Sequence, residues 1–250
     1  CQFGNIGWGS DSSNDHDSDG CVDGNEVLRN FTVPSSFDVV TSSLSDGGVA
    51  FAGVMTSSTT NLTLGSHTVT AVTECDMFVA KMDASGSWDW LHSVVPDGTN
   101  CALVPQLVEA SEDGGFYLLS TFKGSITING TTYSQSVQTD PYADLILVKY
   151  RSNGTAAWSA SMGSEGTLSA SDLTLGTGGV HVALVRDGLG GCNPSTCYFS
   201  ISHSVGGYAT FIDGQNHGES PIGYILGFDG SEWLGRSVFN TYGRTPSSFL

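Results

Sequence analysis

Three stretches of sequence decide the expected fold: GGVAFAGVM at 47–55, GGFYLLSTF at 114–122 and GGVHVALVR at 178–186. Each begins with a glycine pair, which marks a turn, and continues with the apolar residues typical of a β-strand. The glycine pairs are separated by 67 and then 64 residues. A nearly constant period of this length indicates an internal repeat, so we expect a series of equivalent units.

A second landmark follows each of these stretches. It has the form of a strand, a tight turn with Asp or Asn and Gly, and a second strand that carries a tryptophan. The three copies are DMFVAKMDASGSWDW at 76–90, DLILVKYRSNGTAAW at 144–158 and GYILGFDGSEW at 223–233. We expect Trp90, Trp158 and Trp233 to occupy the same place in each unit and to pack as layers of a shared core.

Strand-rich units of this length without helical periodicity predict an all-β fold of antiparallel four-stranded blades, as in a β-propeller. The landmarks give about three full units and a partial unit at each end. The predicted ranges are 1–9 for the end of a preceding repeat, 10–29 for an insertion, 30–104, 105–168 and 169–244 for three repeats, and 245–250 for the start of another.

The second landmark resembles the SBBP-type β-propeller repeats of bacteria and archaea, whose pattern is D-x-F-V-x-K followed by D-x-x-G-x-x-x-W. The first copy matches at Asp76, Phe78, Val79, Lys81, Asp83, Gly86 and Trp90, and the second at Asp144, Val148, Lys149, Gly154 and Trp158. The third copy departs from the pattern, with Gly223 in place of the Asp and Gly227 in place of the Lys. The resemblance implies a fold and no particular activity.

The charge balance restricts the partners. The chain of 250 residues has 8 Lys and Arg against 25 Asp and Glu, a formal net charge of −17. Such a surface repels phosphate backbones and anionic lipid, so we expect no nucleic-acid partner. The sequence has no 18-residue apolar run, so we expect no membrane insertion.

The sequence DHDSDGCVDGNE at 15–26 follows the spacing of a calcium-binding loop. Carboxylates at alternate positions can surround one Ca²⁺, a glycine at the sixth position permits the sharp turn, and the seventh residue offers its backbone carbonyl. The predicted ligands are Asp15, Asp17, Asp19, Cys21, Asp23 and Glu26. The loop adds about a dozen residues between Trp8 and Pro34, so we interpret it as an insertion between blades.

No helical pattern flanks this loop, so it differs from an EF-hand. It resembles the bacterial form of the thrombospondin type 3 repeat, and that resemblance implies a calcium-stabilised spacer on a secreted protein. The alternative is an acidic linker that is simply solvated. A structural calcium is favoured over a calcium sensor, since no amphipathic helix is available to open.

Six cysteines without zinc-finger spacing indicate disulfides and an oxidising compartment. Local pairing predicts Cys192–Cys197, Cys75–Cys101 and Cys1–Cys21, although six cysteines allow about 15 connectivities. Glycosylation sequons at Asn30, Asn61, Asn129 and Asn153 are permissive of a secreted or cell-surface location.

No nucleophile elbow, zincin or P-loop motif is present in the sequence, so catalysis has only weak candidates. His181 alternates with valines in a predicted strand, which is typical of a structural histidine. Asp38, Glu109 and Asp172 can line a central channel if the blades form one. Lys81 and Lys149 recur at one position, where an ion pair or an exposed cation is the simplest interpretation.

The sequence therefore favours a non-enzymatic structural, adhesive or interaction module, stabilised by calcium, that binds copies of itself or surface glycans. Strand sharing between the incomplete terminal units would build a filament. The alternative is a propeller-type glycosidase or lyase that acts on extracellular polysaccharide. A lipid anchor at Cys1 is a third interpretation, which the position of Cys1 inside a predicted repeat disfavours.

Overall fold

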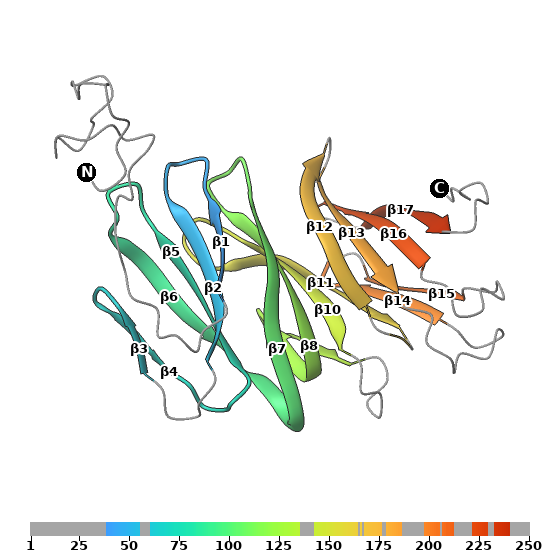
Figure 1. Ribbon diagram of the computed structural model, residues 1–250, viewed down its shortest axis with the longest axis horizontal. Helices are drawn as coiled ribbons and strands as arrows, with labels where there is room; N and C mark the ends of the chain where they lie inside the picture. The colour runs from blue at the N-terminus through green and yellow to red at the C-terminus, as the bar shows by residue number, and fades with distance from the viewer. Residues whose placement is uncertain are drawn as a thin grey trace, which may run out of the picture.

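The computed structural model describes residues 39–55, 61–135, 143–164, 166, 168–176, 179–186, 198–205, 207–212, 222–229 and 233–240. Over these residues the chain forms β-strands and no helix, and every strand pairing is antiparallel (Figure 1). The all-β expectation is therefore confirmed. Within the same residues no helix is long and apolar enough to cross a membrane.

The strands make three main sheets, which lie in an open row in Figure 1. Sheet 1 contains β1 (Val39–Ser43), β2 (Val49–Met55), β5 (Asp76–Met82) and β6 (Trp88–Val94), in that order. Sheet 2 contains β7 (Pro96–Ala110), β8 (Phe116–Ile128), β10 (Asp144–Tyr150) and β11 (Ala156–Ser164). Sheet 3 contains β12 (Leu168–Gly176), β13 (Gly179–Arg186), β16 (Ile222–Phe228) and β17 (Trp233–Asn240).

Additional strands lie between the second and third strands of each sheet along the chain. In the first unit they are β3 (Asn61–Leu64) and β4 (His67–Thr70), which pair only with each other among the described strands. In the second unit β9 (Thr131–Ser134) folds back on the end of β8. In the third unit β14 (Tyr198–His203) and β15 (Gly207–Ile212) leave their own unit and extend sheet 2 beyond β11.

The core has three parts: two lie in seams between the sheets, and a third lies on the outer face of sheet 1, under β3 and β4. The first seam, between sheets 1 and 2, buries residues such as Val79, Trp90 and Phe116. The second seam, between sheets 2 and 3, buries residues such as Trp158, Val182 and Phe228. Strand β10 is buried along its whole length because its alternate side chains enter the two seams in turn, which explains the continuous apolar sequence LILV at 145–148.

The glycine pairs have a direct structural cause. Gly47 and Gly114 adopt positive φ values of 82° and 74°, which a glycine reaches without strain. The second glycine of each pair lies against a backbone carbonyl, so that a Cβ on Gly48 would collide with the oxygen of Met82. The equivalent collisions would be between Gly115 and Tyr150 and between Gly179 and Phe228.

A β-bulge recurs at one place in all three sheets. It lies between the third and fourth strands, at Lys81/Met82, Lys149/Tyr150 and Gly227/Phe228. The repeated bulge shows that the sheets are equivalent in detail, because bulges are specific features and not random defects.

The register corrects one expectation from the sequence. Trp90 and Trp158 pair with Lys81 and Lys149, whereas Trp233 pairs with Phe228. Trp233 is therefore equivalent to Trp88, not to Trp90 and Trp158. The sequence analysis matched the three tryptophans because each follows a turn of the same type. The turn of the third unit is shorter, so Trp233 takes the position of Trp88.

The predicted disulfide between Cys75 and Cys101 is confirmed, with an S–S distance of 2.08 Å. It joins the residue before β5 in sheet 1 to β7 in sheet 2, so it ties the first seam covalently. The other two predicted pairs, Cys192–Cys197 and Cys1–Cys21, lie outside the described residues.

Candidate functional site

The predicted calcium ligands all lie outside the described residues, so they stay predictions; they are Asp15, Asp17, Asp19, Cys21, Asp23 and Glu26. Among the residues that the structure does describe, no cluster of three or more His, Cys, Asp or Glu side chains is placed to hold a metal ion.

The two recurrent lysines form ion pairs, as the simplest interpretation of the sequence predicted. Lys81 Nζ lies 2.8 Å from a carboxylate oxygen of Asp46 and 3.0 Å from one of Asp89. Lys149 Nζ lies 2.7 Å from Asp113 and 4.6 Å from the centre of the Tyr117 ring. Asp46 and Asp113 belong to the turns before the glycine pairs, so each lysine ties the third strand of its sheet to that turn.

The third unit has lost both members of this ion pair. Gly227 takes the lysine position, and Thr177 takes the aspartate position in the sequence. His181 pairs with Gly227, and its ring lies so close to Gly176 that a Cβ there would collide with it. His181 thus fills space beside two glycines, in agreement with its interpretation as a structural histidine.

Of the three carboxylates proposed to line a channel, two lie near each other in the structure. Glu109 is on β7 and Asp172 is on β12, and these first strands of sheets 2 and 3 are neighbours. Partial burial raises the pKa of Glu109, and the negative charge of Asp172 raises it further. Asp38 lies outside the described residues.

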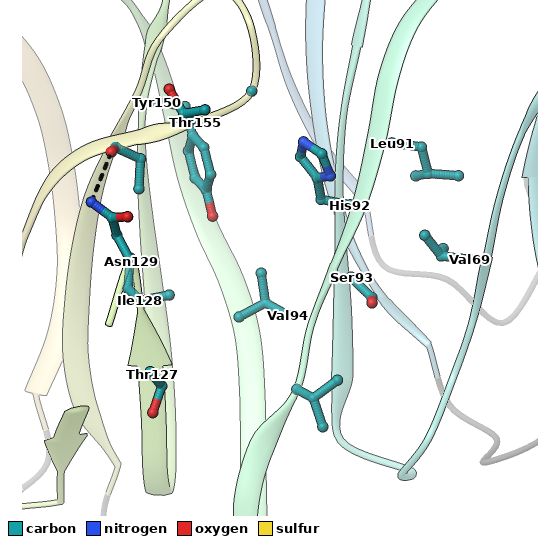
Figure 2. Close-up of a pocket in the computed structure, with 13 residues that line it drawn as sticks. Val69, Leu91, His92, Ser93, Val94, Thr127, Ile128, Asn129, Tyr150 and Thr155 are labelled. Carbon is teal, nitrogen blue, oxygen red and sulfur yellow. Dashed lines mark hydrogen bonds between the residues drawn. The ribbon is translucent and has the colours of Figure 1, made fainter. Parts of the chain in front are cut away.

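A hollow lies at the outer end of the first seam (Figure 2). It has a volume of about 670 Å³, which is within the range of ligand-sized clefts. One wall is β6 and the residue after it, from Leu91 to Val95, with Val69 of β4 beside them. The other wall is the end of β8 with the β8–β9 turn, and Tyr150 with the β10–β11 turn. Figure 2 shows Ile128, Asn129 and Tyr150 across the hollow from Val94.

This groove follows the edge of β6. Successive side chains of a strand point to opposite faces, yet all five consecutive residues 91–95 line the hollow. Leu91 belongs to the core on the outer face of sheet 1, whereas Val94 packs against the first seam. A hollow that touches both faces of a strand lies along its backbone edge, and β6 pairs only with β5 among the described strands.

The groove is uncharged. None of its 13 lining residues is Asp, Glu, Lys or Arg. Partial burial lowers the pKa of His92, and the charge of His67 lowers it further, so the His92 imidazole is neutral near pH 7. Complete burial raises the pKa of the Tyr150 hydroxyl far above its usual value.

The inner end of the groove is rigidly packed. The His92 ring stacks on Trp90 with ring centres 5.0 Å apart, and the Trp90 indole N–H donates a 2.9 Å hydrogen bond to the Ser152 carbonyl. Asn129, at the tip of the β8–β9 turn, donates a 3.5 Å hydrogen bond to the Ala156 carbonyl, and both residues line the groove (Figure 2).

The sequence analysis did not predict this groove. A strand edge leaves no mark in a single sequence, because its hydrogen-bonding groups belong to the backbone of every residue. The one available signal is a difference between two units at one position. His92 pairs with Val79 in sheet 1 as Ala160 pairs with Leu147 in sheet 2, so a histidine in the first unit stands where the second has an alanine.

Three of the predicted glycosylation sequons fall on described residues. Asn61, Asn129 and Asn153 are all exposed, and the last two lie in turns beside the groove.

Comparison with known proteins supplies no family assignment. No protein-family model matches this chain. No curated protein is significantly similar to it in sequence.

Proposed function

We propose that this protein is an extracellular structural and interaction module built from β-propeller-type repeats. The observation that carries the proposal is the recurrence of one four-stranded antiparallel sheet, with the same glycine turn and the same bulge, in three successive units. Sheets that pack face to face in succession are the construction principle of propeller blades. The SBBP-type resemblance of the second landmark supports the same interpretation.

We further propose that a bound Ca²⁺ stabilises the module through the acidic loop at 15–26. Its support is the ligand spacing in the sequence, together with a net charge of −17 that attracts cations. Thermal unfolding with and without a chelator tests this. At about 1,000 times its dissociation constant, one ion contributes about 4 kcal/mol, so the chelated protein should melt clearly lower. An Asp17→Asn, Asp19→Asn variant should abolish the difference, and equal melting temperatures for the unmodified protein would contradict the calcium site.

A secreted or cell-surface location is the compartment that fits these features. The Cys75–Cys101 disulfide is compatible with an oxidising compartment. The exposed sequon asparagines are accessible to a glycosylation enzyme. Cell fractionation with an epitope-tagged full-length protein tests the location, and recovery in the reducing cytosol would contradict it.

Assembly into filaments by strand sharing is the finer form of the proposal. Its support is the pairing of β14 with β11, in which a strand from one unit extends the sheet of another. Electron microscopy of the purified protein tests it: filaments are expected, and uniformly isolated particles would exclude self-assembly under those conditions.

An enzyme that cleaves extracellular polysaccharide is the second candidate. The observation that favours it is the carboxylate pair Glu109 and Asp172, where the raised pKa of Glu109 suits a proton donor. Incubation with a panel of polysaccharides separates the two functions, because only an enzyme releases shortened sugars. Loss of that release in a Glu109→Gln variant would then assign the acid.

A further inference from the structure

The two seams differ at one position, and the difference identifies a binding site. At the outer end of the second seam, β14 pairs antiparallel with β11 over residues 160–164. Its side chains Phe199, Ile201 and His203 are buried between sheets 2 and 3. A strand donated by the third unit thus completes the outer edge of sheet 2 and closes the second seam.

The groove of Figure 2 lies at the equivalent position of the first seam. Residues 92–94 of β6 pair with β5 as residues 160–162 of β11 pair with β10. Residues 92–94 line the groove, whereas residues 160–162 pair with β14. The hollow is therefore located where a β14-like strand would lie. Val69 of β4 borders it, but β4 pairs with β3 and not with β6.

The backbone of β6 is oriented to accept such a strand. Ser204 is the residue just after β14. Its N–H donates a 2.9 Å hydrogen bond to the carbonyl oxygen of Ser159 in β11, and the Ser159 N–H donates a 3.0 Å hydrogen bond to the Ser204 hydroxyl. Alternate residues of a strand direct their backbone groups to the same side. Leu91 is equivalent to Ser159. The N–H and C=O groups that face the groove are therefore those of Leu91 and Ser93 in β6 and of Val95 just after it.

We propose that this groove binds an extended polypeptide segment from a partner protein, as an added antiparallel strand on the edge of β6. Backbone hydrogen bonds with residues 91, 93 and 95 would provide the pairing, as in other strand-addition complexes. The uncharged lining favours a segment without charged side chains at its centre, with apolar residues at alternate positions. The net charge of −17 favours a partner without acidic flanks.

A histidine exchange between the seams specifies one residue of that segment. In the second seam, the His203 ring of β14 packs against Trp158 with ring centres 5.0 Å apart and planes tilted by 30°, and it lies opposite the small Ala160. In the first seam, His92 of β6 itself stacks on Trp90 at the same 5.0 Å. The imidazole position is therefore already filled, so the partner residue opposite His92 must be small.

The probe for this site is a synthetic peptide, Tyr-Phe-Ser-Ile-Ser-Ala, with two lysines added at each end for solubility. It copies residues 198–202 and replaces the final histidine of β14 by alanine. A peptide of the same composition with its apolar residues placed consecutively is the control. Titration calorimetry should show the alternating peptide binding at least about tenfold more tightly than the control, since only it pairs in register. Equal binding of the two peptides, or no binding of either, would overturn the proposal.

A pair of substitutions at Ser93 isolates the backbone contact. Ser93 is exposed, and its N–H faces the groove, so proline there removes a donor from the outer edge and leaves the pairing with β5. Ser93→Pro should lower the affinity for the peptide by about tenfold or more, whereas Ser93→Ala should bind the peptide as the unmodified protein does. If Ser93→Pro unfolds, hydrogen exchange in the unmodified protein decides instead: the peptide should protect the Ser93 and Val95 amides, and unchanged exchange would contradict the site.

A specificity change at His92 gives the sharpest result. The His92→Ala variant makes β6 resemble β11 at this position, so it should prefer a peptide that ends in histidine over one that ends in alanine. The unmodified protein should show the opposite preference. An unchanged preference would refute the histidine exchange.

This inference deepens the proposed interaction role and rests on it for its biological use. The peptide measurements involve neither calcium nor polymerisation, so their failure would leave the filament and chelator results standing, and the reverse also holds.

Discussion

The first and second seams are built from equivalent sheets but are closed by different means. A strand from the third unit, β14, closes the second seam by extending sheet 2 and stacking His203 on Trp158. The first seam has no such strand among the described residues. It has instead the disulfide between Cys75 and Cys101, the stack of His92 on Trp90, and an open groove.

The difference shows that equivalent sheets can be joined in two ways. In a seam that is closed by a strand of the same chain, both the backbone edge and the apolar faces of the sheet are covered. A seam that is tied by a covalent bond farther in can leave its outer edge available. The disulfide ties sheet 1 to sheet 2 without occupying the edge of β6.

The largest effect should come from removal of this covalent tie. A Cys75→Ser, Cys101→Ser variant releases a cross-link across 26 residues, which should destabilise the protein by about 3 kcal/mol. Chemical denaturation measures the loss. The native state of the first seam should also open more often, so hydrogen exchange should rise in β5 and β6 and stay constant in β13 and β16. Uniform changes in both seams would contradict the local role of the disulfide.

A glycine at the first seam should give the next largest effect. Gly154 and Gly130 have φ values of 84° and 80°, so alanine strains the backbone equally at both, by about 1–2 kcal/mol. At Gly154 a Cβ would also lie 2.6 Å from His92 Nε2 and 2.8 Å from Trp90, whereas at Gly130 it would meet nothing within 4 Å. Gly154→Ala should therefore cost about 1–3 kcal/mol more than Gly130→Ala in chemical denaturation. Equal losses of stability in the two variants would mean that the Trp90 and His92 side chains move aside easily.

The two histidines provide a direct comparison of the seams. His203 is buried and stacks on Trp158 and Phe228, so His203→Ala should destabilise the protein by about 1–3 kcal/mol. His92 is exposed along the groove, so His92→Ala should change the stability by less than about 0.5 kcal/mol. Thermal unfolding of the two variants checks the order, and a larger cost at His92 would refute the distinction between a closed and an open seam.

The smallest expected effect is on the loss of folding stability at low pH. The hydrogen bond from Lys81 lowers the pKa of Asp46. At Asp113, partial burial is the largest single influence and acts to raise the pKa, but the hydrogen bonds from Lys149, the Gly115 N–H and Ser111, with the Lys149 charge, together outweigh it, so the pKa is lowered. A carboxylate whose pKa is lowered by folding stabilises the native state above its unfolded pKa of about 3.9, and this stabilisation is lost as the pH falls through the folded value.

Both carboxylates are more than one third exposed, so solvent screening limits each contribution to under about 1 kcal/mol. Between pH 5 and pH 2, an Asp46→Asn, Asp113→Asn variant should lose less stability than the unmodified protein. Hydrogen exchange near pH 3 should increase around the turns of sheets 1 and 2 and not in sheet 3, where Gly227 replaces the lysine. An unchanged acid profile in the double variant would show that the ion pairs do not respond to pH in this range.

Much of the fold was predictable because it depends on local chemistry. The paired glycines predicted turns, and the structure shows a positive φ at Gly47 and a close carbonyl contact at Gly48. The apolar runs predicted strands, and the antiparallel sheets confirm them. The lysine pairing was also accessible, since Lys81 and Lys149 recur at one position. The misplacement of Trp233 arose because a shorter turn in the third unit shifts the register without changing the order of residues.

The candidate site was not predictable from the sequence. Trp90 packs in the first seam and Trp88 packs on the opposite side against Phe51, because the bulge between them reverses the alternation, and a single sequence does not show where a bulge lies. The calcium ligands, in contrast, were predicted from spacing alone, and the structure leaves them untested.

The sequence by itself determined the repeated strand-turn-strand units, the turn chemistry and the residues that form the core, since each follows from backbone sterics and from the exclusion of apolar side chains from water. Only the tertiary structure decided that β14 would pair with β11, while among the described strands none but β5 pairs with β6. Pairing of a strand edge depends on backbone groups that every residue carries, so the choice between partners is made by the space and shape left between packed sheets.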